Sequence, residues 1–274
     1  MKWITFSRKM GTNGSEIART VADELGYLFY ETEAINRMAQ QMGILDSVRE
    51  ADERVPSIFH RLFSLKPTVY FDRLYSVIYE LARQGDAVFL GRGSHILLRA
   101  FDCALHVRVT ASLQTRIQSL VARGFTPEAA ARAILRSDGE REAFIKFAFG
   151  VDWDNPELYD LVLNMDKLPV GLAVRTVVDL ARSNEIAEAS GDALRSLEMM
   201  ALRNRADAAL IEAGLSVGRT ASTSVSVVKP GTLRLEGFVA SEEERREVET
   251  VLQCVKGVES IQNELRVIPA GHTT

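Results

Sequence analysis

The sequence predicts an α/β fold in which helices flank a parallel sheet, followed by a small C-terminal α+β domain. Three observations support this fold class. Short apolar runs alternate with helical patterns through the first two thirds of the chain. A glycine loop separates the first of these runs from the first helix. After about residue 184 the chain has two neighbouring runs in which apolar and polar residues alternate. Strands that recur between helices are typical of a parallel sheet covered on both faces.

The elements of the first part follow from apolar spacing. Strands are expected at Trp3–Phe6, Ala87–Leu90, Ala104–Val109 and Leu161–Leu163, with a weaker candidate at Tyr27–Tyr30. Helices are expected over 15–25, 32–42, 70–84, 112–122, 127–136 and 170–182. Residues 45–68 are more polar and less periodic, as expected for an insertion that covers an active site.

The last part of the chain has the pattern of a separate module. Ala193–Ala213 has helical spacing, and "TSVSVV" and "TLRLEGFV" flank a Pro-Gly turn, which predicts a hairpin. Ser241 and Glu244 have capping-box spacing at the start of a further helix, and "GVESIQNELRVI" closes with a strand. We place the domains at 1–184 and 191–268, because "SNEIAEASGD" between them is polar and has no apolar stripe.

Composition and charge narrow the function classes. With 46% hydrophobic residues, 26% charged residues and a net charge of −4, the chain has the composition of a globular protein and not of a general nucleic-acid binder. Cys103 and Cys254 belong to no CxxC motif, which favours reduced thiols in the cytoplasm over one long-range disulfide. The first apolar run is too short for a signal peptide, and no run approaches the ~20 residues of a membrane span. We therefore expect a cytoplasmic protein.

The stretch "KMGTNGSEIA" follows the first predicted strand. Asn-Gly favours a hairpin turn, but a helical face follows it in place of a second strand. A strand, a glycine loop and a helix in this order direct backbone N–H groups and the positive end of the helix dipole at an anion. Gly11 and Gly14 would let the chain turn tightly against phosphate oxygens. Taken alone, the stretch fits a structural turn equally well.

Arginines gather in two further segments. "FLGRGSHILL" places Arg92 after a strand, at the sheet edge where open α/β folds bind ligands. "ARGFTPEAAARAILRSDGEREAF" contains Asp138 and the arginines Arg123, Arg132, Arg136 and Arg141. Like charges four residues apart on a helix repel unless an anion joins them. A solvent-exposed helix face, on which nearby acidic residues neutralise the arginines, explains the spacing of these arginines equally well.

The segments "ITFSRKMGTNGSEIARTVADELGYLFYETEAINRMA", "FLGRGSHILLR" and "RGFTPEAAARAILRSDGEREAFIKFAFGVDWDNPELYDLVLNMDKL" together resemble the cytidylate kinase-like family of P-loop nucleoside monophosphate kinases. The resemblance covers roughly residues 1–182, and "DWDNPELYDLVLN" is its most specific part. It implies transfer of the γ-phosphoryl group of ATP, with Mg2+, to a nucleoside monophosphate such as CMP.

The resemblance also implies roles for individual residues. The ATP phosphates would bind the loop Gly11, Thr12, Asn13, Gly14, Ser15 and Glu16. Arg37 in "AINRMA", Arg92 and Asp138 would hold the acceptor, and Arg136 and Arg141 of "RSDGER" would act on the transferred group. Phosphoryl transfer depends mainly on alignment and on neutralising negative charge, and the planar fork of arginine suits both tasks.

The loop departs from the pattern GxxxxGK[ST], in which Lys contacts the β- and γ-phosphates and Ser or Thr binds magnesium. Aligned on Gly14, the chain has Ser15 in place of Lys and Glu16 in place of the hydroxyl. Lys9, or Arg8, would reach the phosphates instead, and we predict Lys9 as the catalytic cation and Ser15 as the metal ligand. The alternative is a nucleotide-binding sensor with little or no turnover that regulates the C-terminal module.

The tail "VKPGTLRLEGFVASEEERREVETVLQCVKGVESIQNELRVI" resembles a BON domain. The resemblance implies a small binding module, and we expect it to act in regulation, through a ligand or through homo-oligomerisation. Membrane contact is not expected, because the module is acidic.

Overall fold

The computed structural model describes residues 2–42, 67–183, 193–215 and 223–268. The predicted insertion at 45–68 lies outside the described residues except for its last two, and the predicted boundary at 184–191 lies entirely outside them. Within the described part of the chain, no helix combines the length and the apolar character needed to cross a bilayer.

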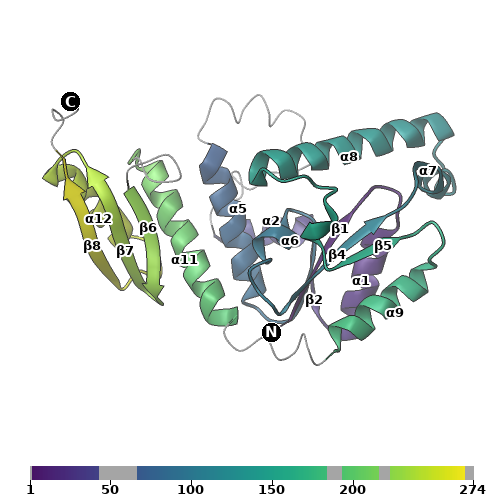
Figure 1. Cartoon of the computed structure of the whole chain (residues 1–274), viewed down its shortest axis with the longest axis horizontal. Helices are drawn as coiled ribbons and strands as arrows, with labels where there is room; N and C mark the ends of the chain where they lie inside the picture. The colour runs from purple at the N-terminus through teal and green to yellow at the C-terminus, as the bar shows by residue number, and fades with distance from the viewer. Residues whose placement is uncertain (1, 43–66, 184–192, 216–222, 269–274) are drawn as a thin grey trace.

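Five strands form the predicted parallel sheet (Figure 1). Their order is β2-β3-β1-β4-β5, and every neighbouring pair is parallel. Their bounds are β1 Trp3–Arg8, β2 Leu28–Tyr30, β3 Ala87–Leu90, β4 Ala104–Thr110 and β5 Leu161–Asn164. Since β1 is central and its two neighbours come later in the chain, its carboxyl end lies at the position where such sheets bind ligands.

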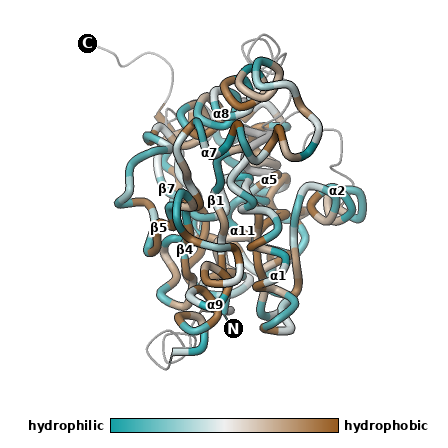
Figure 2. Tube along the Cα trace, turned by 90° about the vertical axis from the view of Figure 1, so that its right-hand side faces the viewer, coloured by the Kyte–Doolittle hydropathy of each residue, from teal (hydrophilic) through white to brown (hydrophobic). Residues whose placement is uncertain are grey.

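Helices α1 (Gly14–Leu25) and α9 (Val170–Ala181) cover one face of the sheet and contact each other (Figure 2). Their apolar sides pack on alternate strand residues that include Ile4, Phe6 and Val107. Burial on this face explains why the apolar spacing of both helices is visible in the sequence.

The opposite face is covered by α2 (Thr32–Gln41) and α5 (Pro67–Ala82). Trp3 and Phe89 of the sheet pack there against Ile35 and Ile78. The short helix α6 (Ser94–Leu97) follows β3 and contacts β1.

Helices α7 (Leu113–Val121) and α8 (Pro127–Phe149) contact each other beyond the carboxyl end of the sheet (Figures 1 and 2). The side chain of Thr126 caps α8 by accepting a hydrogen bond from the N–H of Ala129. The prediction ended this helix at residue 136, which is wrong, because α8 continues through Gly139. Phe144 and Ile145 are buried beyond that glycine, and their packing outweighs its low helix propensity.

The C-terminal part contains the predicted hairpin and the helix after it. Strand β6 (Thr223–Lys229) is antiparallel to β7 (Thr232–Val239), and β8 (Ser260–Val267) is parallel to β7. Helix α12 (Glu242–Gln253) begins after Ser241, whose hydroxyl accepts the N–H of Glu244 at 3.1 Å. The Glu244 carboxylate accepts the N–H of Ala240 at 2.7 Å, one residue before the donor expected in a capping box.

Helix α11 (Ala193–Glu212) belongs to both hydrophobic cores. Figure 1 shows it between α5 and the three-stranded sheet. Its first half contributes Ala193, Leu197 and Ala201 to the core around α5, and its second half contributes Leu202, Ala206 and Leu210 to the core under β6–β8. The predicted domain division assigns the whole of α11 to the second domain, whereas the helix packs in the hydrophobic cores of both domains.

Candidate functional site

A tight loop joins the central strand β1 to helix α1 in the predicted order of strand, loop and helix. Gly11 and Asn13 have φ angles of 82° and 58°, and the helix begins at the next residue, Gly14. The Thr12 hydroxyl donates to the carbonyl of Lys9 at 2.8 Å and accepts the N–H of Gly14 at 3.3 Å. The side chains of Ser15 and Glu16 are exposed in the first turn of α1.

Both loop glycines are required by close packing. A Cβ atom at Gly11 would lie 2.8 Å from the carbonyl oxygen of Arg116, and one at Gly14 would lie 2.7 Å from Cβ of Arg8. These separations are shorter than van der Waals contact. The loop therefore combines a turned backbone with the amino end of a helix, which is the arrangement that binds phosphate.

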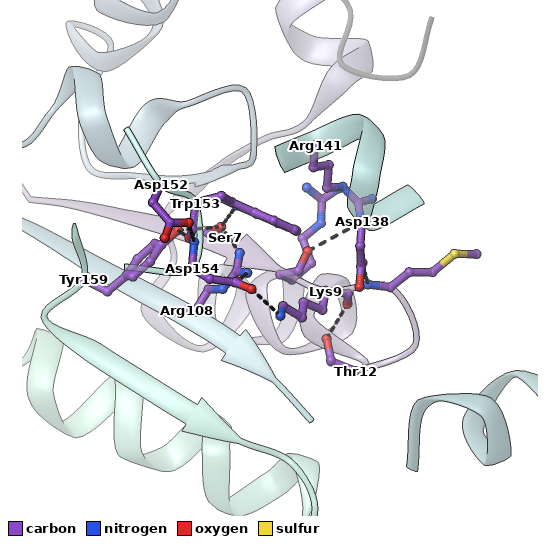
Figure 3. Close-up of polar contacts among 12 residues, drawn as sticks. Ser7, Lys9, Thr12, Arg108, Asp138, Arg141, Asp152, Trp153, Asp154 and Tyr159 are labelled. Carbon is purple, nitrogen blue, oxygen red and sulfur yellow. Dashed lines mark hydrogen bonds and ion pairs between the residues drawn. The ribbon is translucent and has the colours of Figure 1, made fainter. Parts of the chain in front are cut away.

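Helices α7 and α8 contact this loop directly. The Asp138 carboxylate accepts hydrogen bonds from the backbone N–H of Met10 at 3.1 Å and from Nη1 of Arg116 at 2.5 Å. Arg141 donates to the carbonyl of Arg8 at 3.5 Å, and the Asn13 side chain accepts a hydrogen bond from Arg123. The structure thus brings Asp138 and Arg141 to the loop (Figure 3).

Arg136 is not brought to the loop. Its side chain is 71% exposed and pairs with Glu140 on the same helix at 2.9 Å. Arg141 lies five residues further along the continuous helix α8 and therefore points about 140° away around the axis, at about 100° per residue. The two arginines that the sequence groups together therefore lie on different faces.

The two arginines predicted to hold the acceptor differ in their surroundings. Arg92, in the Gly91–Gly93 turn after β3, is buried and has a φ of 59°. A Cβ atom at Gly93 would lie 2.3 Å from the ring of Phe149, so the end of α8 packs closely on this turn. Arg37 on α2 is exposed. Asp138 lies against the glycine loop, as described above.

Lys9 points away from the loop amides toward a charged cluster that the sequence analysis did not identify (Figure 3). Its Nζ lies 2.7 Å from Oδ2 of Asp154, and Oδ1 of that carboxylate lies 2.6 Å from Nη2 of Arg108. Burial alone would raise the pKa of Asp154, but the hydrogen bonds and charges of Lys9 and Arg108 outweigh it and hold the pKa below its ordinary value.

The Ser7 hydroxyl lies at the centre of this cluster, at the end of β1. It is 2.7 Å from Nη1 of Arg108, 2.9 Å from the indole N–H of Trp153 and 3.3 Å from the hydroxyl of Tyr159. The guanidinium carbon of Arg108 lies 3.7 Å from the centroid of the Trp153 ring. A buried arginine is stabilised here by hydrogen bonds, a carboxylate and an aromatic face together.

Two buried histidines border the cluster. Burial, with a smaller electrostatic effect of His106, Arg108 and Arg99, lowers the pKa of His95 to about 3, and its ring stacks on Tyr159. Burial likewise lowers the pKa of His106 to about 4, although Asp160 opposes the shift. Both rings are therefore neutral at pH 7.

A signal for Arg108 was present in the sequence. Arg108 pairs with Ser7 in the register of β4 and β1, and His106 pairs with Thr5. Polar residues at alternate positions of two strands inside a sheet covered on both faces would indicate a buried polar cluster. Asp154 and Trp153 lie between α8 and β5 in irregular structure without strand alternation, and only the family-like segment "DWDNPELYDLVLN" contains them.

A parallel sheet whose central strand leads through a glycine loop into a helix defines a P-loop kinase-like α/β domain. Residues 3–167 match the cytidylate kinase-like family, and the chain belongs to that family. Residues 202–269 match the BON domain. Both family resemblances expected from the sequence are confirmed.

One curated protein and two solved structures are similar to this chain. A cytidylate kinase from Pyrobaculum aerophilum is 28% identical over 180 residues, which cover 64% of this chain and 90% of that protein. The solved structure of an uncharacterized protein from Eubacterium ventriosum has the same fold, with a TM-score of 0.54 and 16% identity over 66% of this chain and 97% of its own. A shikimate kinase from Bacteroides thetaiotaomicron gives a TM-score of 0.40 at 11% identity, over 66% of this chain and 99% of its own. The family indicates a nucleotide or nucleoside kinase.

Proposed function

We propose that this protein transfers the γ-phosphoryl group of ATP to a nucleoside monophosphate, with CMP the first acceptor to test. The loop between β1 and α1 supports the proposal most strongly. It lies at the carboxyl end of the central strand, has two left-handed residues and leads directly into a helix. Arg141 reaches the same loop from α8, so a cation is available beside the phosphate chain.

In this proposal the loop Gly11–Glu16 holds ATP, and Arg37 and Arg92, with Asp138, hold the acceptor. Arg92 keeps a left-handed φ of 59° that favours glycine, a strain that is commonest at functional sites. Arg141 neutralises charge on the transferred group, and Arg136 would need to turn from Glu140 to join it.

Magnesium fits the hydroxyl of Ser15, an oxygen ligand exposed at the start of α1. Among the described residues, no group of three or more His, Cys, Asp or Glu side chains could hold a metal ion. The nucleotide phosphates and water would therefore supply most of the other ligands. When bound, the ion would neutralise phosphate charge and help to align the transferred group.

The experiment pairs two assays on the full chain. ATP or ADP should raise the melting temperature, because a ligand bound only by the folded state stabilises it. An assay coupled to ADP release should then show turnover with CMP in a panel of nucleoside monophosphates. ADP release that does not depend on any acceptor would overturn the proposed transfer.

A second candidate function is a nucleotide sensor in which binding alters the BON-like module. Helix α11 packs in both hydrophobic cores, and this favours the sensor, because a shift of that helix would change the packing of both cores. In this proposal the module binds a regulatory ligand or a second copy of the chain. Hydrogen exchange in β6–β8, measured with and without ATP, tests it: altered protection supports coupling, and unchanged protection in the presence of bound ATP contradicts it.

A further inference from the structure

The pattern GxxxxGK[ST] can be placed on this loop in two registers, and the backbone distinguishes them. A loop glycine is needed where φ is positive. The residue with positive φ directly before α1 is Asn13, and asparagine tolerates that region better than most side chains. Gly14 is the first residue of α1 and has no positive φ. Asn13 therefore takes the place of the second glycine.

This register shifts every neighbouring residue by one place relative to an alignment on Gly14. Gly14 now stands where the lysine belongs, and Ser15 stands where the pattern has Ser or Thr. Arg8, five residues before Asn13, stands where the first glycine belongs. The loop thus keeps its hydroxyl, has exchanged its lysine for glycine and has exchanged its first glycine for arginine.

The two exchanges are related in space. A Cβ atom at Gly14 would lie 2.7 Å from Cβ and 3.2 Å from Cγ of Arg8. The stem of Arg8 therefore fills the space that a side chain at position 14 would need. Arg8 is only 7% exposed, so the side chain that occupies this space is buried.

The ammonium group of Lys9 is bound to a carboxylate outside the loop. This group bonds to Asp154 at 2.7 Å, and that carboxylate also pairs with the buried Arg108. Movement of Lys9 to the phosphates would remove one of the two cations that compensate Asp154, at a modest cost because that carboxylate is 56% exposed. This cost disfavours Lys9 as the substitute for the loop lysine.

We infer that Arg8 supplies the positive charge that lysine supplies in the usual loop, and that it contacts the terminal phosphates of the bound nucleotide. The inference rests on the proposed function, because it requires ATP in this loop. The planar guanidinium binds two phosphate oxygens in a fixed bidentate geometry, whereas the lysine ammonium acts as a point charge. The glycine at position 14 is then the residue that makes room for it.

Equilibrium binding of ADP, ATP and AMP to the full chain tests the inference. Arg8→Met keeps the stem and removes the charge, and it should weaken ADP and ATP about 10- to 100-fold, as expected for loss of a charged hydrogen bond. AMP has no terminal phosphates at this position, so its affinity should change much less. Lys9→Met should weaken ADP less than Arg8→Met does. Lys229→Met, in the other domain, controls for loss of one charge.

An exchange of residues gives a second, independent measurement. Arg8→Gly should lose ADP affinity as Arg8→Met does, and Gly14→Lys alone should lose it because its side chain overlaps Arg8. The double variant Arg8→Gly/Gly14→Lys should bind ADP more tightly than either single variant, since it restores the usual arrangement. Thermal melting without nucleotide identifies any variant that fails to fold.

Two results would overturn the inference: wild-type ADP affinity in folded Arg8→Met, or a folded double variant that binds no better than Arg8→Gly. Failure of the proposed function gives different results: the wild-type chain binds neither ADP nor ATP, or it binds them and transfers no phosphoryl group to an acceptor.

Discussion

The Nζ atom of Lys9 lies 2.7 Å from Oδ2 of Asp154, although the two residues are far apart in the sequence (Figure 3). This ion pair ties the glycine loop to the irregular segment between α8 and β5. Asp154 also holds Arg108, which is buried between Ser7 and the ring of Trp153. The glycine loop and the polar cluster beside it are therefore one connected structure.

The first prediction concerns Asp154. Its pKa in the folded protein lies below the ordinary value of 3.8, so its contribution to stability is complete above that pH and is lost as pH falls through the folded pKa. Asp154→Asn should lower the free energy of unfolding at pH 7 by about 1–2 kcal/mol, a modest figure because the carboxylate is half exposed. Urea unfolding should show this difference shrinking below about pH 4.

Asp102→Asn is the matched control, because Asp102 is exposed and precedes the amino end of β4, at the opposite end of that strand from Arg108. If Asp154→Asn lowers the free energy of unfolding no more than this control does, the cluster contributes nothing to stability.

The second prediction concerns His95, whose folded pKa of about 3 keeps it neutral while the unfolded chain takes up a proton near pH 6.5. The stabilisation is therefore complete above pH 6.5 and is lost as pH falls toward the folded value, by at most about 1.4 kcal/mol per pH unit. His95→Phe keeps an aromatic ring against Tyr159 and removes the titration. Urea midpoints between pH 6.5 and 4 should fall less steeply in this variant, and an unchanged slope would contradict the prediction.

The third prediction separates Arg141 from Arg136, both on α8. Arg141→Met should lower kcat by about 10²-fold, as expected for one lost group that stabilises transition-state charge. Arg136→Met should cause a smaller loss, because Arg136 pairs with Glu140 on the opposite side of the helix. Steady-state kinetics with saturating ATP and CMP measure both. Equal losses would mean that α8 rearranges during turnover so that both arginines reach the phosphates.

The fourth prediction concerns α11. Both tryptophans of the chain, Trp3 and Trp153, lie in the first domain, so their fluorescence reports unfolding of that domain alone. Leu210→Ala removes buried side-chain volume from the other core and should cost about 2–5 kcal/mol there. If α11 couples the cores, the unfolding transition reported by tryptophan fluorescence should move to lower urea concentration in this variant.

Leu197→Ala, on the part of α11 that packs in the first core, is the matched variant and should move the same transition directly. A tryptophan transition that responds to Leu197→Ala but not to Leu210→Ala would show that the domains unfold independently.

Much of the fold could be predicted because its signals are local. The sheet strands are short apolar runs, and Ser241 caps α12 as its spacing indicates. Helix α8 was predicted to end at residue 136, and only the burial of Phe144 shows that the helix continues through Gly139. The shared packing of α11 depends on contacts between distant segments, which no local pattern contains.

The site was less predictable than the fold. Glycine spacing located the glycine loop between β1 and α1, but its register depended on the φ angle of Asn13, which the sequence does not specify. Lys9 was chosen as the cation from its place in the loop, whereas its contact with Asp154 depends on the tertiary structure. Arg108 carried a signal in its strand that was not used.

The central claim is that the glycine loop holds ATP for transfer to a nucleoside monophosphate. The most direct measurement follows the label from [γ-32P]ATP, with magnesium and CMP, in the wild-type chain, in Gly11→Ala and in Gly26→Ala. Both glycines have positive φ, but a Cβ atom would collide with Arg116 at Gly11 and would meet nothing at Gly26. The account predicts labelled CDP from the wild-type chain and from Gly26→Ala, and little or none from Gly11→Ala. It would be contradicted if no nucleoside monophosphate became labelled, or if folded Gly11→Ala transferred the label as fast as the wild-type chain.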